Sequence, residues 1–147
     1  MLEFDVANGA AADLSCRRTQ DQLVGWMKAG LVWGLWLATP CVTLTRARRA
    51  NTAGLPRPLR SSALPHGLPG LTEAEQVQVR DANKLIAFAG RLLALAARVG
   101  VIAGEENPNT STLWCFPDRR KLLDRHYHAF VDFCFSGLPA RKRTRLL

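Results

Sequence analysis

The chain has 147 residues, 48% of them hydrophobic, which is enough to bury one core but hardly two. Its 20 Lys and Arg outnumber its 12 Asp and Glu, giving a formal net charge of +8, and most of the cations are arginines, which suit phosphate and carboxylate partners. Compositional drift explains this excess equally well, because net charge bears on partners and not on fold.

The cysteines and the apolar segments argue against a secreted disulfide scaffold, a zinc finger and a membrane protein. The four cysteines lie far apart and form no CxxC pair. The most apolar segment, residues 29–39, is about half of the roughly 20 residues that a membrane span needs. No signal peptide is visible. We therefore expect one domain over residues 1–147, in a reducing intracellular compartment, nuclear or cytoplasmic.

The first third of the chain predicts a strand, a helix and a second strand. Residues 2–7 alternate between apolar and polar side chains, as a half-buried strand does, and run into a turn. Thr19 and Gln22 fit a capping box, so we expect a helix from there to Gly30, its natural stop. Residues 31–37 are continuously apolar, which predicts a strand buried on both faces.

A basic loop follows this strand. Residues 42–70 are rich in Pro, Gly, Ser and Arg, and loops of this length are usually functional or flexible. Nothing in residues 46–68 is expected to bury a face, so this stretch should be the least ordered internal segment. No acidic residue occurs between Asp21 and Glu73, whereas the same stretch contains the cations Lys28, Arg46, Arg48, Arg49, Arg57 and Arg60.

The second half of the chain predicts a long helix and three short strands. Thr72 and Glu75 form a second capping box, and apolar residues follow a helical period from there to Val99, with Gly100 as the stop. A helix of this length spans roughly 40 Å, so we expect a break near residues 81–83. The predicted strands are residues 101–103, 129–134 and 144–147.

Strands that alternate with helices predict an α/β fold with a parallel sheet and helices on both faces. Ligands of such sheets bind at the carboxyl ends of the strands. Cys41 comes just after the strand predicted at 31–37, and Glu106 comes just after the one at 101–103. We therefore expect both side chains at the same edge of the sheet.

A cysteine at a strand end beside basic residues can act as a nucleophile, although a lone cysteine is more often a small buried hydrophobic residue. The arginines that follow Cys41 stand at positions 46 and 48, so the Cys-x5-Arg spacing of a phosphatase is not met. His126 and His128 would share one face of a strand, but no third ligand lies nearby in the sequence, so we assign no metal site.

Three motifs follow one another along the chain: Thr39-Pro40-Cys41, then Glu106-Asn107-Pro108, then Ser136-Gly137-Leu138-Pro139 followed by Arg141-Lys142-Arg143-Thr144. In this order they resemble motifs of the cytosine-C5 DNA methyltransferase family, in particular its divergent phage-like and retroelement-like members. That family has a Pro-Pro-Cys loop at the first position, Glu-Asn-Val or Glu-Asn-Pro at the second, and Tyr-Gly-x-Pro with a basic string at the third. The resemblance implies a doubly wound, Rossmann-like methyltransferase sheet.

The resemblance also implies a role for each matched residue. Cys41 would attack C6 of a cytosine turned out of the DNA duplex, and Glu106 would hydrogen-bond to N3 and the exocyclic amine of that base. The remaining roles are substrate positioning by Asn107, Arg141 and Lys142, nucleic-acid contacts by Arg46, Arg48 and Arg49, and contacts with the cofactor S-adenosylmethionine by Asp5, Asp13 and Pro40.

The match covers only the middle of a complete catalytic domain. The chain departs from the family at Thr39, Ala140 and Thr144, and the family's first strand with its Gly-rich cofactor loop has no counterpart. We therefore expect a partial sheet that lacks its first strand, no enzymatic activity of this chain alone, and self-association through the incomplete sheet edge. The alternatives are a non-catalytic, basic nucleic-acid-binding or retroelement-derived module and a decayed gene product.

Overall fold

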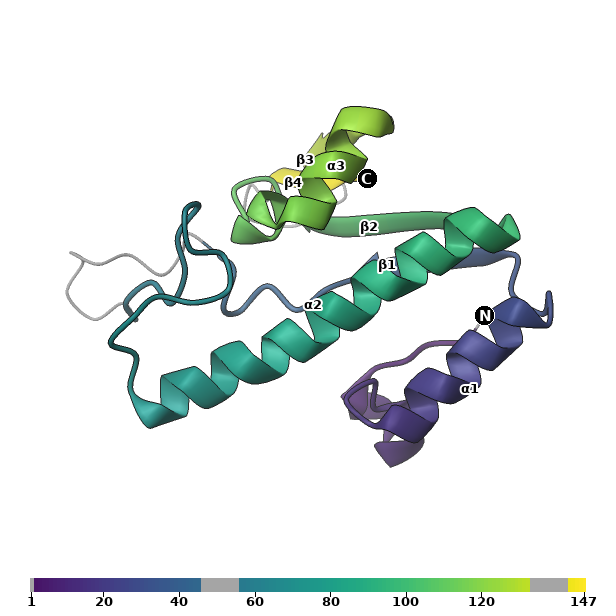
Figure 1. Ribbon diagram of the computed structural model, residues 1–147, viewed down its shortest axis with the longest axis horizontal. Helices are drawn as coiled ribbons and strands as arrows, with labels where there is room; N and C mark the ends of the chain where they lie inside the picture. The colour runs from purple at the N-terminus through teal and green to yellow at the C-terminus, as the bar shows by residue number, and fades with distance from the viewer. Residues whose placement is uncertain (1, 46–55, 133–142) are drawn as a thin grey trace.

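The structure is a computed structural model that describes residues 2–45, 56–132 and 143–147 (Figure 1). No helix in these ranges is long and apolar enough to cross a membrane. The helices are α1 (Arg17–Lys28), α2 (Glu73–Val99) and α3 (Pro117–Arg125), with short 3₁₀ helices η1 (Val6–Asn8), η2 (Ala10–Ala12) and η3 (Thr112–Cys115). The strands are β1 (Gly34–Ala38), β2 (Ile102–Pro108), β3 (Ala129–Asp132) and β4 (Arg143–Leu146).

The described strands form one mixed sheet in the order β1-β2-β4-β3. β1 and β2 are parallel and are connected through α2, whereas β4 runs antiparallel to both β2 and β3. The predicted α/β class is confirmed at this level, but the fully parallel sheet is wrong. A parallel connection needs about a dozen residues or more, and only residues 133–142 separate β3 from β4.

Helix α2 begins and ends as the sequence predicts. Glu75 N donates to Oγ1 of Thr72 (3.3 Å), and Thr72 N donates to Oε2 of Glu75 (2.8 Å), which completes the capping box. Gly100 adopts a φ of +75°, the left-handed conformation that ends a helix without a Cβ clash. The break expected near residues 81–83 is wrong, because the helix is continuous through that point.

The segment before α1 forms local turns instead of the strand predicted at residues 2–7. Asp5 Oδ1 accepts a hydrogen bond from Ala7 N (2.8 Å), and such short-range bonds compete with strand pairing. The capping box predicted at Thr19 is also wrong. Helix α1 begins earlier, at Arg17, and Thr19 is buried within its first turn.

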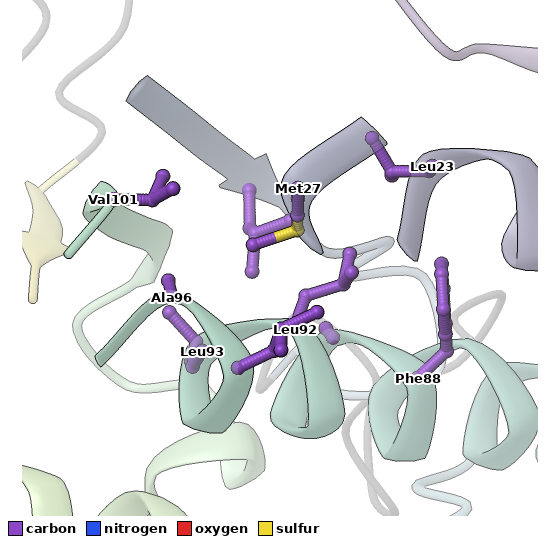
Figure 2. Close-up of a cluster of buried hydrophobic side chains, with 10 residues drawn as sticks. Leu23, Met27, Phe88, Leu92, Leu93, Ala96 and Val101 are labelled. Carbon is purple, nitrogen blue, oxygen red and sulfur yellow. The ribbon is translucent and has the colours of Figure 1, made fainter. Parts of the chain in front are cut away.

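Helix α2 lies at the centre of the core (Figure 1). Figure 2 shows Phe88 and Leu92 of α2 in one cluster with Leu23 and Met27 of α1, and Leu37 of β1 belongs to the same cluster. A second cluster joins α2 to η3 and to the start of α3, and its buried members are Leu44, Ile86, Leu113, Trp114 and Phe116. Helix α2 thus packs against α1, the sheet and the η3–α3 segment.

Within the described residues, helices cover one face of the sheet around β1 and β2. Leu37 and Glu105 are register partners; Leu37 packs on α2, and Glu105 pairs with Arg119 of α3. On the opposite face Trp36 and Ile102 are 58% and 73% exposed. We expected helices on both faces of the sheet, and we expected the strand at residues 31–37 to be buried on both faces. Both expectations are wrong for this part of the chain.

Strand β1 lies at the edge of the sheet, because its only strand partner in the described ranges is β2. Natural sheets usually protect such edges with charged residues or proline. No charged residue or proline occurs between Leu31 and Ala38. Self-association through this edge stays a prediction.

Part of the predicted flexible loop is packed. Residues 46–55 lie outside the described residues, but Leu59 and Arg60 are only 1% and 4% exposed. Leu59 packs in a cluster with Val79 of α2. The expectation that this loop buries nothing is therefore wrong for its described part.

Candidate functional site

The carboxyl end of β1 lies beside the second half of β2. Ala38, the last residue of β1, is the register partner of Glu106. The sequence predicted that Glu106 and Asn107 follow a strand ending at 103, but β2 continues to Pro108 because β4 pairs with its second half. Both residues therefore lie within the strand, and the loop placement is wrong.

Two hydrogen bonds join the Thr39-Pro40-Cys41 turn to β2. Asn107 Nδ2 donates to Thr39 O (2.6 Å), and Thr39 Oγ1 donates to Oε1 of Glu105 (2.7 Å). Thr39, Glu105 and Asn107 are 7%, 0% and 3% exposed, so these bonds lie in a low-dielectric interior where they are strong. The first two sequence motifs are therefore in direct contact.

Cys41 is a half-buried free thiol at the start of a turn. Its carbonyl oxygen accepts hydrogen bonds from Leu44 N (2.9 Å) and Thr45 N (3.0 Å). Leu44 is buried, and its own carbonyl oxygen accepts a hydrogen bond from Thr112 N (3.0 Å) of η3. The turn that carries Cys41 is thus held by η3 at one end and by β2, through Thr39, at the other.

Glu106 is half-buried, and its side chain points to the sheet face opposite that of Asn107, because successive side chains of a strand alternate. The strand register brings Glu106 to the end of the sheet at which the Cys41 turn begins. Contact of both side chains with one base stays a prediction.

The two predicted cofactor carboxylates are engaged in local turns. Asp13 accepts hydrogen bonds from Ser15, at Oδ1 from the backbone N (2.7 Å) and at Oδ2 from Oγ (2.8 Å), and these bonds hold the pKa of Asp13 below its ordinary value. Asp5 accepts from Ala7 N, as described above. Neither aspartate follows a strand of the described residues, so neither fits a contact with the ribose or adenine of S-adenosylmethionine. Pro40, the third predicted cofactor residue, is exposed beside Cys41.

Outside the described residues lie all three predicted nucleic-acid contacts, Arg46, Arg48 and Arg49, and two predicted substrate-positioning residues, Arg141 and Lys142. Two other cations of the acid-free stretch, the exposed Arg57 and the buried Arg60, bind to other residues of this chain. Arg57 Nε donates to Oε1 of Glu75 (2.8 Å). Arg60 Nη1 donates to Oδ1 of Asn83 (2.6 Å), and burial lowers the pKa of Arg60 to about 10. Part of the positive charge of that stretch is therefore engaged in contacts within the chain and is not available to bind a nucleic acid.

Strand β4, which begins at Arg143 of the third motif, lies beside β2. Arg145 of β4 is the register partner of Asn107. Its guanidinium carbon lies 5.5 Å from the ring centroid of Trp114 and 5.2 Å from that of Phe130, and its Nη2 donates to Oδ1 of Asn109 (3.1 Å). Burial lowers the pKa of Arg145. Strand β4, which includes the last two residues of the third motif, is thus paired with β2, which contains the second motif.

Sequence reasoning missed the buried ion pair of Glu105 and Arg119. Arg119 Nε donates to Oε2 of Glu105 (2.8 Å), and Nη2 donates to Oε1 (2.9 Å), with both side chains 0% exposed. In the sequence, Arg119 is the first of three consecutive basic residues, a pattern typical of a solvated helix face. Glu105 lies on a strand and Arg119 on a later helix, and no spacing rule within one element predicts a contact between two elements. The sequence therefore offered no signal for this ion pair.

No protein family, curated protein or solved structure matches this chain. Among the residues whose positions are described, no group of three or more His, Cys, Asp and Glu side chains is placed to hold a metal ion. What the chain does is therefore inferred from the chemistry at the ends of β1 and β2.

Proposed function

We propose that the chain forms the cytosine-binding part of a site like that of DNA cytosine-C5 methyltransferases, with Cys41 as the nucleophile and Glu106 as the carboxyl group that bonds to the base. The observation that carries this function is the 2.6 Å hydrogen bond from Asn107 Nδ2 to Thr39 O. It joins the Pro-Cys turn to the Glu-Asn-Pro segment across 68 residues of sequence. Two motifs of the resemblance thus meet in space, as a shared site requires.

In this site the Cys41 thiolate adds to C6 of an extruded cytosine. A sulfur lone pair forms the S–C6 bond, the C5=C6 electrons shift to C4–C5, and the C4=N3 electrons shift to N3, which takes a proton from the Glu106 carboxyl group. The product is an enamine that is nucleophilic at C5. Water then protonates C5, the hydroxide left behind removes the other C5 proton as the C5=C6 bond re-forms and the sulfur is expelled, and N3 returns its proton to the Glu106 carboxylate, which regenerates cytosine, the thiolate and the carboxyl group.

S-adenosylmethionine is the methyl donor that the resemblance implies, and when bound it supplies a methyl group for C5. Because Asp5 and Asp13 do not fit this cofactor, we assign to the chain the addition to the base and not the methyl transfer. Arg141 and Lys142 would position the base or its phosphate by charge.

The test uses a DNA duplex with 2-pyrimidinone in place of one cytosine, flanked by randomised bases. Loss of the 4-amino group makes C6 more electrophilic, so addition is trapped without a methyl donor. Intact-mass spectrometry of the 147-residue chain should show a protein–DNA adduct. Cys41→Ser should abolish it, and Glu106→Gln should slow its formation by about tenfold or more.

Cys115→Ser is the matched control, since Cys115 is also a half-buried free thiol, and it should react like the wild type. No adduct with the wild type, or an adduct mapped by peptide digestion to Cys16 or Cys115, contradicts the proposed function.

Exposed aromatic and basic side chains around β3 favour a second function. Tyr127 is fully exposed, Phe130 is 42% exposed, and the Arg143 guanidinium carbon lies 5.1 Å from the Phe130 ring centroid. Aromatic rings and arginines bind single-stranded nucleic acids by stacking and charge. The chain would then be a non-catalytic nucleic-acid-binding module of a reducing intracellular compartment. That function predicts DNA binding without an adduct, and equal binding by Cys41→Ser.

A further inference from the structure

We infer that Thr39 is a positioning residue that fixes the turn carrying Cys41, and that the buried pair of Glu105 and Arg119 fixes Thr39. This role rests on the proposed function, because Cys41 is the nucleophile that the turn presents. Nothing in the sequence motifs assigns a role to Glu105 or Arg119.

Thr39 is held through both its side chain and its backbone. Its Oγ1 donates to Oε1 of Glu105 (2.7 Å), and its carbonyl oxygen accepts from Nδ2 of Asn107 (2.6 Å). Pro40 follows directly, and its ring fixes its own φ and restricts Thr39 to extended conformations. The two bonds at Thr39 and the ring of Pro40 therefore leave the backbone little freedom to move the Cys41 thiol.

Arg119 holds Glu105 in the orientation that Thr39 needs. Its guanidinium donates to both oxygens of Glu105, at 2.8 and 2.9 Å, and Nη2 also donates to Ile86 O of α2 (3.2 Å). Burial acts to lower the pKa of Arg119, but its hydrogen bonds and charge interactions with Glu105 and Asp118 outweigh burial and raise it. The pair thus joins α2, α3 and β2 at a point 0% exposed to water.

The opposite end of the turn is anchored independently. Leu44 is 1% exposed, and its carbonyl oxygen accepts hydrogen bonds from both N (3.0 Å) and Oγ1 (3.3 Å) of Thr112. With Leu44 fixed on η3, two side-chain contacts tie the start of the turn to β2, namely the Thr39 hydroxyl on Glu105 and the Asn107 amide on the Thr39 carbonyl oxygen, and a change of the Thr39 side chain removes the first alone. β1 itself does not depend on it, since its backbone pairs with β2 from Gly34 to Ala38.

The test compares Thr39→Val, which removes the hydroxyl at nearly constant shape, with Thr39→Ser, which keeps it. With saturating 2-pyrimidinone DNA, Thr39→Val should slow adduct formation at Cys41 by about tenfold to a hundredfold, as small misplacements of a reacting group do. Thr39→Ser should stay within about twofold of the wild type. The Kd for DNA and the urea midpoint are measured alongside, and the DNA affinity of Thr39→Val should be unchanged.

Amide hydrogen exchange gives a readout that needs no chemistry at Cys41. Leu44 N and Thr45 N donate to Cys41 O, so their exchange should accelerate in Thr39→Val and not in Thr39→Ser. Thr144→Val is the matched control, because the Thr144 hydroxyl is buried in β4 and has no hydrogen-bond partner among the described residues, and neither readout should change.

The outcomes separate the positioning role from the proposed function. A wild-type chain that forms no adduct contradicts the function, whereas faster exchange at Leu44 and Thr45 in Thr39→Val still supports the positioning role. Unchanged exchange in Thr39→Val overturns that role, as does a loss of adduct formation that is equal in Thr39→Val and Thr39→Ser.

Discussion

Gly90 of α2 lies directly against Arg119 of α3: a Cβ at position 90 would stand 2.7 Å from Nη1 of Arg119 and 2.6 Å from Oδ2 of Asp118. Glycine within a helix is unfavourable by roughly 0.5–1 kcal/mol relative to alanine. At this position it allows α3 to approach α2 closely enough for Arg119 to reach Glu105 in β2. The close approach of the two helices therefore underlies the buried ion pair.

Gly90→Ala should lower the free energy of unfolding by about 1–3 kcal/mol, the usual effect of overpacking. The new methyl group would displace Arg119, which its buried bonds to Glu105 hold in place. Gly25→Ala is the matched control, since no described atom apart from its chain neighbours and its own helix backbone lies within 4 Å of a Cβ there, and it should raise stability by about 0.5–1 kcal/mol. Urea denaturation measures both; a stabilising Gly90→Ala would show that Arg119 moves freely.

The sequence predicted best where the chemistry is local. The capping box of Thr72 and Glu75 and the stop at Gly100 depend on residues within one helical turn, and both are present. Thr19 and Gln22 fit the same pattern, but Thr19 is buried, and helix α1 already begins at Arg17. Tertiary burial overrode a local signal there.

The sequence failed where partners are distant. The apolar run before Thr39 fits a central strand equally well, and only the order of the described strands places β1 at the edge of their sheet. The strand that carries Glu106 was predicted too short because its second half is completed by β4, from the other end of the chain. Glu105 and Arg119 were missed for the same reason. Juxtaposition of the first two motifs was predictable; the buried bonds that produce it were not.

Stability should depend on pH through Glu75. The hydrogen bond from Arg57, followed by that from the Thr72 backbone, lowers the pKa of Glu75 from its ordinary 4.5 to about 2. Because the pKa is lower in the folded chain, this stabilisation is complete above pH 4.5 and is lost as the pH falls toward 2. Between these values the urea midpoint should fall less steeply for Glu75→Gln than for the wild type. Glu73→Gln, in the same helical turn, should keep the wild-type slope; equal slopes for all three chains would contradict the assignment.

Affinity for nucleic acid should depend on salt through Arg46, Arg48 and Arg49. If they contact phosphates, log Kd should rise with log salt by about 0.9 per phosphate neutralised. Replacing all three with Gln should reduce that slope by roughly 2–3 units, as measured by fluorescence anisotropy with a DNA duplex. Arg17→Gln with Arg18→Gln, two exposed cations of α1, is the control and should leave the slope unchanged. An unchanged slope in the triple variant would show that these three arginines do not contact phosphates and that the charge of the loop reflects composition alone.

The chain should not bind S-adenosylmethionine at micromolar concentrations. Dinucleotide cofactors of doubly wound sheets bind where a Gly-rich turn joins a strand to a helix and lets the backbone approach the ligand closely, and we expect S-adenosylmethionine to need a comparable turn. The described turn after β1 is Thr39-Pro40-Cys41, which contains no glycine, and the carboxylates of Asp5 and Asp13 accept hydrogen bonds within their own turns. Isothermal titration calorimetry of the 147-residue chain should therefore give no binding heat. If heat is observed, the double variant Asp5→Asn with Asp13→Asn locates the site. Loss of binding in that variant would restore both aspartates as cofactor ligands, whereas retained binding would place the cofactor on other residues.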